Sequence, residues 1–185
     1  RARRWDAPEA CVGAGQAALG VRANGVVALT LDLGNVNESG RGMRVSAVTT
    51  SAVALDYTPE NDLLTTRLAE PGRAGHRIDV TVEYRGAPAA GLHIGPNKYG
   101  DRTFFRDNWR TRGRSWLPTI DHPDEKATGE FVGTAPSHYQ VVSTGLLVEE
   151  SDLEDGARLT HWKQSVPISP WLYTLGVARF AVQNV

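Results

Sequence analysis

HRIDVTVEY, residues 76–84, is the stretch of this chain that most directly predicts its fold. Ile78, Val80 and Val82 occupy every second position, and charged or hydroxyl side chains stand between them. Because successive side chains of a β-strand point to opposite faces, this alternation predicts a strand with one buried and one solvated face. The β-branched residues on the apolar face favour the same structure.

Similar runs recur along most of the chain, separated by short turns that contain Gly, Asn, Asp or Pro. Strands are therefore expected at residues 26–33, 43–50, 52–57, 63–68, 76–84, 129–134, 140–149, 157–164 and 172–182. No amphipathic helix with capping residues is found, and only a turn is expected at residues 8–10. The pattern predicts an all-β domain, a large twisted antiparallel sheet or saddle-like sandwich with few or no helices.

Length and composition narrow the functional classes. A chain of 185 residues suits one domain, spanning residues 1–185. The formal net charge of -1 gives no reason to expect nucleic acid as a partner, and no apolar run approaches the ~18 residues of a membrane span. Cys11 is the only cysteine, which excludes an internal disulfide and a cysteine-rich metal cluster. It favours a reducing compartment only weakly, because many secreted proteins also lack disulfides.

Residues 103–130, TFFRDNWRTRGRSWLPTIDHPDEKATGE, carry the clearest functional signal. Aromatic and Arg side chains are enriched at recognition surfaces, because each presents a large area on few torsions. The Arg residues in and beside this stretch could bind an anionic ligand, or could be neutralised internally by nearby carboxylates, which we favour. The Arg residues are Arg102, Arg106, Arg110, Arg112 and Arg114, of which the last three alternate as on one face of a strand; the carboxylates are Asp101, Asp107, Asp121 and Asp124.

Catalytic motifs are not found. The five His are widely spaced, and HExxH, GxSxG and a Gly-rich phosphate loop before a helix do not occur. His122 stands between two carboxylates and could be a ligand or a base. The segment around it, Asp121-His122-Pro123-Asp124, is more typical of a turn, in which Asp121 is expected to accept backbone N–H bonds. The residues alone therefore predict a β-rich domain with an aromatic and Arg recognition edge.

Three blocks from Thr103 onward resemble the end of the N-terminal, β-saddle domain of the aminopeptidase N family of zinc metallopeptidases. The blocks are the stretch quoted above, VVSTGLLVEE (141–150) and HWKQSVPISPWLYTLGVARF (161–180), and their order and spacing make the match specific. Residues 15–100 agree only in being rich in strands. The residues that carry the resemblance are Arg114, Trp116, Pro118, Asp121, Pro123, Lys126, Ser143, Gly145, Trp162, Pro167, Leu172, Gly176 and Phe180.

The resemblance implies a non-catalytic domain that helps to form a substrate cleft and to bind the free amino terminus of peptides. The implied partners are a peptide substrate and the catalytic domain of the same protein, which is expected after Val185 and would carry GxMEN, HExxH and the zinc. Neither motif occurs here, so no cofactor is expected in this chain. Many members bind the substrate amine through a Gln or Glu upstream of the Pro that corresponds to Pro118. That register falls here on Asp107, Asn108 and Trp109, so these residues are the predicted substrate-binding site.

Two alternatives of other classes stay open. One is a free-standing β-sandwich binding module whose aromatic recognition edge uses Trp109, Trp116 and Trp171 as a stacking platform, for example for sugars. It requires exposed, coplanar indoles. The other is a purely structural sandwich domain of a larger extracellular protein.

Overall fold

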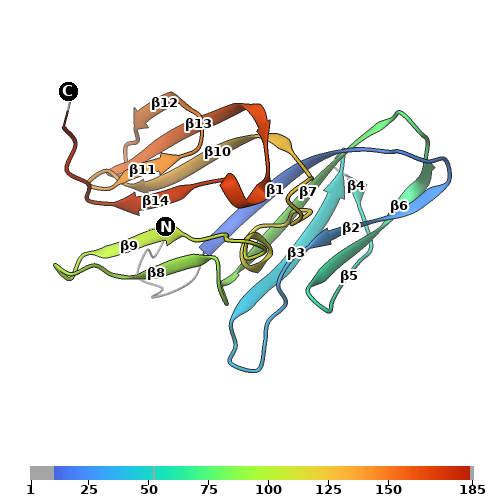
Figure 1. The fold of residues 1–185 in the computed structure, drawn as a ribbon, viewed down its shortest axis with the longest axis horizontal. Coiled ribbons are helices and arrows are strands. Elements are labelled where there is room, and N and C mark those ends of the chain that lie inside the picture. Colours follow the sequence, from blue (N-terminus) through green and yellow to red (C-terminus); the bar gives the residue numbers. More distant parts are fainter. Residues whose placement is uncertain (1–10, 52, 184–185) are drawn as a thin grey trace. The chain divides into compact units, whose positions relative to one another are not determined.

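The computed structural model describes residues 11–51 and 53–183, and within these ranges the chain consists of strands and two short 3-10 helices (Figure 1). The all-β prediction is confirmed. The turn expected at residues 8–10 lies outside the described residues. No helix in the described part of the chain is long and apolar enough to cross a membrane.

The described residues group into two compact units. The first contains the residues up to Gly91 together with Arg112–Asp121, and the second contains Leu92–Thr111 and the residues from His122 onward. The first unit holds sheets of order β1-β7-β3-β4 and β2-β6-β5, and the second holds sheets of order β10-β13-β12 and β11-β14-β9-β8. The strands of the first unit are β1 (Cys11–Gly20), β2 (Val26–Asp32), β3 (Gly42–Thr50), β4 (Val53–Ala54), β5 (Tyr57–Glu60), β6 (Leu63–Gly72) and β7 (Arg77–Ala87).

The strand predicted from residues 76–84 is β7, which lies at the centre of the first unit's larger sheet, between β1 and β3. Val80 and Val82 are each 1% exposed, and Val48 of β3, paired with Val82, is equally buried. Strand β1 was not predicted, because its sequence CVGAGQAALG lacks β-branched alternation. It is a strand because it pairs with β7 without a register shift, from Cys11↔Gly86 to Gly20↔Arg77, which satisfies its backbone groups.

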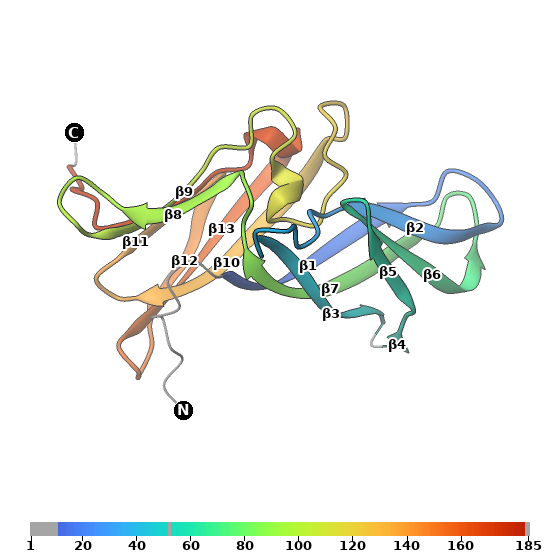
Figure 2. The same ribbon diagram turned by 90° about the horizontal axis from the view of Figure 1, so that it is seen from below.

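The second unit contains β8 (Leu92–Pro96), β9 (Arg102–Arg106), β10 (Ala127–Pro136), β11 (Gln140–Ser143), β12 (Leu146–Asp152), β13 (Ala157–Ile168) and β14 (Leu175–Ala178), and Figure 2 shows it from below. The Trp162 indole N–H of β13 donates to the backbone oxygen of Val141 in β11, at 3.0 Å, and so joins the unit's two sheets. Strands β8 and β9 had not been predicted as separate strands from the apolar pattern.

Three predicted runs are wrong in their continuity. Residues 140–149 form two strands in different sheets, because Gly145 turns the chain at φ +97°, and a Cβ there would lie 2.1 Å from the Lys163 oxygen. In the run predicted at 52–57, residue 52 lies outside the described residues, and residues 53–57 are divided between β4 and β5 by the buried Leu55 and its neighbour. Only residues 175–178 of the run 172–182 are a strand, and a 3-10 helix, η2 (Pro170–Leu172), precedes it.

Arg110, Arg112 and Arg114 would share one face if their segment were a strand, but the segment is not a strand. Residues 109–112 turn, and a 3-10 helix, η1 (Gly113–Ser115), follows. The backbone N–H of Arg114 donates to Asp121 Oδ2 at 3.0 Å, and the Arg114 guanidinium contacts Asp32 Oδ1 at 3.0 Å. Asp121, whose side chain is 1% exposed, also donates its own N–H to Asp32 Oδ2 at 2.8 Å. The predicted role of Asp121 as an acceptor of a backbone N–H is therefore confirmed.

Gly91 and Arg112, the residues that flank the segment 92–111, approach each other closely through their backbones. Gly91 has φ +76°, and a Cβ at this position would lie 2.1 Å from the backbone oxygen of Arg112. Only glycine permits both the left-handed conformation and this contact. Residues 92–111 therefore leave the first unit and rejoin it at adjacent backbone positions.

We expect Asp121→Ala to lower the free energy of unfolding by about 1–3 kcal/mol, because it leaves the partly buried Arg114 N–H without its carboxylate. The matched control is Asp124→Ala, since the Asp124 side chain is 91% exposed in the same turn. That variant should change stability by less than about 0.5 kcal/mol. Urea unfolding followed by circular dichroism measures both, and equal losses would contradict the role given to Asp121.

Candidate functional site

The residues predicted to bind substrate form a recognition loop, residues 107–109, which begins where β9 ends at Arg106. Asn108 is buried at 2% exposure, and Trp109 is 58% exposed. Asp107 is half-buried, and its Oδ1 accepts the backbone N–H of Trp109 at 3.3 Å. The three neighbours thus differ in their access to a ligand: the indole is presented to solvent, the carboxylate is partly accessible, and the amide is enclosed.

The recognition loop is braced against η2. One guanidinium nitrogen of Arg106, Nη2, donates to the Pro170 oxygen at 3.2 Å and also to the Trp171 oxygen. The side-chain amide of Asn108 donates to the same Pro170 oxygen at 3.4 Å. Hydrogen bonds from a charged donor are stronger than neutral ones, so Arg106 is the main link between the loop and η2.

Trp109 and Trp171 form an edge-to-face pair, with ring centroids 5.0 Å apart and an interplanar angle of 78°. This is a favoured arrangement for two aromatic rings, worth about 0.5–1.5 kcal/mol beyond the area they bury. The pair holds the exposed Trp109 indole in one orientation. A cation or a planar group can therefore meet a preformed aromatic surface at this loop.

Arg106, Pro170 and Trp171 were not predicted as supports of the site. Arg106 was predicted only as a member of an Arg cluster neutralised by carboxylates, whereas its Nη2 donates to two backbone oxygens. Within that cluster, Arg114 does contact Asp121, but its other carboxylate partner is Asp32. A backbone oxygen that accepts a hydrogen bond cannot be recognised from the residue type. Only the pairing of β9 with β14 could have indicated that η2, the element just before β14, lies beside the end of β9.

The stacking platform required by the binding-module alternative is contradicted. Trp116 is 7% exposed in the first unit, and Trp109 and Trp171 are nearly perpendicular rather than coplanar. A flat run of three indoles for a sugar ring therefore does not form from these residues.

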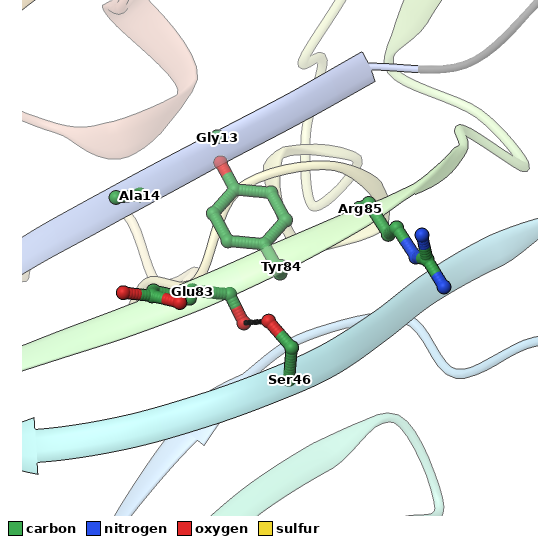
Figure 3. A pocket seen from close by; sticks show the side chains of 6 residues that line it. All are labelled: Gly13, Ala14, Ser46, Glu83, Tyr84 and Arg85. Atoms are coloured by element: carbon green, nitrogen blue, oxygen red, sulfur yellow. Dashed lines mark hydrogen bonds between the residues drawn. The ribbon is translucent and has the colours of Figure 1, made fainter.

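The first unit contains a shallow hollow of about 330 Å³ on its β1-β7-β3 sheet, lined by Gly13, Ala14, Ser46, Glu83, Tyr84 and Arg85 (Figure 3). The Tyr84 ring points towards Gly13, where a Cβ would lie 3.3 Å from the ring. The Ser46 hydroxyl donates to the Glu83 backbone oxygen at 3.2 Å. The hollow is therefore explained by the small residues of β1 making room for Tyr84, and it holds no pair of a nucleophile and a base.

Within residues 11–51 and 53–183, no group of three or more His, Cys, Asp or Glu side chains is arranged to hold a metal ion. A zinc site needs three or four such ligands around one point. The residues described here therefore do not fit a zinc ion, and no chemical step is assigned to one in this chain.

A family model shows the family of this chain, and solved structures share its fold. The sequence-family model of the peptidase M1 N-terminal domain matches residues 29–172 of this chain. An M1 zinc metallopeptidase from Deinococcus radiodurans has the same fold, with a TM-score of 0.78, 22% identity and coverage of 92% of this chain and 38% of that chain. A mutant of the Deinococcus radiodurans enzyme bound to a Tyr-Ser-Ala substrate gives the same values. A two-domain M1 zinc metallopeptidase mutant bound to L-tryptophan has a TM-score of 0.77, 22% identity and coverage of 90% and 38%.

This chain spans 38% of the length of the solved structures that it matches. No protein of curated function matches it in sequence.

We expect Arg106→Met to destabilise the second unit by roughly 1.5–3 kcal/mol, because methionine keeps the length of the side chain and removes its charged donors. Acrylamide should also quench tryptophan fluorescence more strongly, since the bracing of Trp109 against η2 is weakened. Arg110→Met is the control, because Arg110 is exposed and lies beyond the braced residues. Identical unfolding and quenching for the two variants would contradict the bracing.

The isolated chain should bind no stoichiometric zinc and should hydrolyse no peptide, because it lacks both HExxH and a ligand cluster among its described residues. Metal analysis after mild chelation, together with an assay on aminoacyl substrates, checks this. Equimolar zinc that survives chelation would contradict it.

Proposed function

This chain belongs to the family of peptidase M1 N-terminal domains, and on that premise we propose that it forms the substrate-side wall of a zinc-dependent aminopeptidase. In this proposal the chain carries no catalytic group. Its recognition loop helps to bind the free amino terminus of a peptide, while the neighbouring catalytic domain of the same protein holds the zinc and hydrolyses the bond. The observation that carries the proposal is the exposed Trp109 indole on a loop braced by Arg106 and Asn108.

The catalytic domain is proposed to follow Val185. The support is that the matched metallopeptidase structures are much longer than this chain, which covers 38% of them. The reading frame of the parent gene tests this part of the proposal. It should contain HExxH downstream of Val185, and a stop codon directly after Val185 would exclude the proposed arrangement.

A protonated amino terminus needs a negative or electron-rich neighbour when it leaves water. Asp107 can supply a carboxylate oxygen, and a hydrogen bond to a charged group is worth about 1.5–3 kcal/mol. Trp109 can supply its π face, and a cation over an indole gains roughly 0.5–2 kcal/mol, more as the site is desolvated. The two groups are two positions apart in the chain, and the Asp107 carboxylate accepts the Trp109 N–H, so one ammonium could use both.

Asn108 has a different place in the proposal. Its amide is buried and donates to the Pro170 oxygen, so its contribution is to hold Asp107 and Trp109 in position. A direct contact of the Asn108 amide oxygen with the substrate amine stays a prediction, and it requires that the loop rearrange on binding.

In the full-length enzyme we expect Asp107→Ala, Asn108→Ala and Trp109→Ala each to raise KM for a free-amine dipeptide substrate by about tenfold, which corresponds to ~1.4 kcal/mol of lost binding. For Asp107 and Trp109 the reason is a lost partner of the ammonium, and for Asn108 it is a displaced loop. Steady-state kinetics measure the effect, and unfolding curves separate binding from folding. Asn108→Ala should lower stability through its lost hydrogen bond to Pro170, and Trp109→Ala through its lost contact with Trp171.

Arg110→Ala serves as the matched control, because it alters an exposed residue next to the loop and should leave KM within about twofold of wild type. Unchanged kcat/KM in all three loop variants would show that the assignment of the site is wrong, even though the family stands.

A further inference from the structure

Strand β12 lies at the edge of the β10-β13-β12 sheet, beyond β13 (Figure 1). In the part of the chain that the structure describes, β13 is the only strand that pairs with β12, so one side of the β12 backbone has no strand partner. Three consecutive apolar residues of β12 are exposed, Leu146 by 77%, Leu147 by 47% and Val148 by 54%. The free backbone groups of such an edge can pair with a further strand.

Three other edge strands carry features that hinder pairing of this kind. Strand β5 contains Pro59, β8 ends at Pro96, and β4 has only two residues. Strand β12 contains no Pro, Lys or Arg. Its register with β13 shifts between Leu147 and Glu149, but from Glu149 to Asp152 the pairing is regular. This regular part of the edge can therefore accept another strand.

The β12 edge is strongly acidic. Residues 146–158, which comprise β12, the turn after it and the start of β13, contain five carboxylates and one basic residue, Arg158. Their formal net charge is therefore -4, in a chain whose total is -1. Arg158 contacts Glu150 at 3.1 Å and Asp152 at 2.7 Å, and one base cannot neutralise five carboxylates. The carboxylates are Glu149, Glu150, Asp152, Glu154 and Asp155.

This charge selects the strand that the edge can accept. If two copies of β12 paired antiparallel about Glu149, that residue would lie opposite itself, and in a parallel pair each carboxylate would lie opposite its equivalent. Like charges directly opposite each other destabilise a strand pair, whereas opposite charges stabilise it. Glu149 and Glu150 are successive residues and so point to opposite faces of the sheet. A basic side chain on either face of an added strand therefore meets a carboxylate.

We propose that β12 binds a basic, extended polypeptide segment of another protein, which joins the β10-β13-β12 sheet as a fourth strand. Main-chain hydrogen bonds to the free edge supply affinity, and alternate side chains supply specificity. Lys or Arg side chains of the partner lie beside Glu149, Glu150 and Asp152, and its apolar side chains lie against Leu146 and the two residues after it. The inference goes beyond the proposed function and does not depend on it, because β12 lies outside both the recognition loop and η2.

The test uses the full-length protein and a fluorescein-labelled peptide of four Lys-Val repeats. Fluorescence anisotropy should show saturable binding, and the double variant Glu149→Lys, Glu154→Lys should weaken it about tenfold, because it places cations beside the cations of the peptide. The matched control is Glu38→Lys, Glu70→Lys, which makes the same change of charge at two exposed residues of the first unit. It should stay within about twofold of wild type, and unfolding curves check that both variants are folded.

Two further peptides separate strand addition from simple attraction between charges. The Lys-Val peptide with every backbone nitrogen methylated keeps its charge but has no N–H donors, so it should bind about tenfold more weakly. A peptide of four Glu-Val repeats should not bind. Equal affinity of the methylated and unmethylated peptides, or equal weakening in the two double variants, would overturn the proposal.

Hydrogen exchange locates the added strand. Amides within residues 146–152 should exchange more slowly when the Lys-Val peptide is bound, while those of the edge strand β2 should not change. Unchanged exchange within β12 would contradict the proposal. If sedimentation shows a dimer that the peptide does not dissociate, and the β12 amides are already protected in it, then the edge binds a second copy and the proposal is wrong.

Discussion

The hydrogen bond that the Arg114 N–H donates to the buried Asp121 carboxylate is the interaction on which the conformation of residues 112–121 in the first unit depends. Asp32 receives both the Arg114 guanidinium and the Asp121 N–H. Removing one member of a buried charged cluster leaves the others without partners, which costs more than the cluster gains by forming. These contacts hold residues 112–121 on the first unit. Gly91 and Arg112, the two residues of this unit that flank residues 92–111 in the chain, also lie in close backbone contact.

In the recognition loop and the residue before it, some side chains hold the loop in place and another is exposed to solvent. Arg106 and Asn108 direct their donors to the backbone of η2, and Trp109 keeps more than half of its surface exposed. A functional side chain is precise only when its neighbours are fixed, and the edge-to-face contact with Trp171 supplies that restraint. This arrangement explains how a loop, rather than a strand or a helix, can present an indole in one orientation.

Features that depend on neighbouring residues in the sequence, such as a strand or a turn, could be predicted from the sequence. The alternation of residues 76–84 predicted a strand, and the turn residues around Asp121 predicted an acceptor of backbone N–H groups; both are present. Strand β1 was missed because glycine and alanine carry no alternation, and it is specified by pairing with β7. Asp32 was missed as a partner of Asp121 because 89 positions separate them. The support of Trp109 by η2 was missed because a backbone oxygen has no residue signature. The register of residues 107–109 came from the family resemblance alone.

We propose that the recognition loop contacts the amino terminus of a peptide substrate in the full-length protein. A crystal structure of the full-length protein with a bound tripeptide tests it most directly. The account predicts that the peptide's α-nitrogen lies within hydrogen-bonding distance of an Asp107 oxygen, at about 3 Å, or within about 6 Å of the Trp109 ring centroid. An α-nitrogen whose contacts all come from the catalytic domain, with the recognition loop beyond both distances, would contradict it.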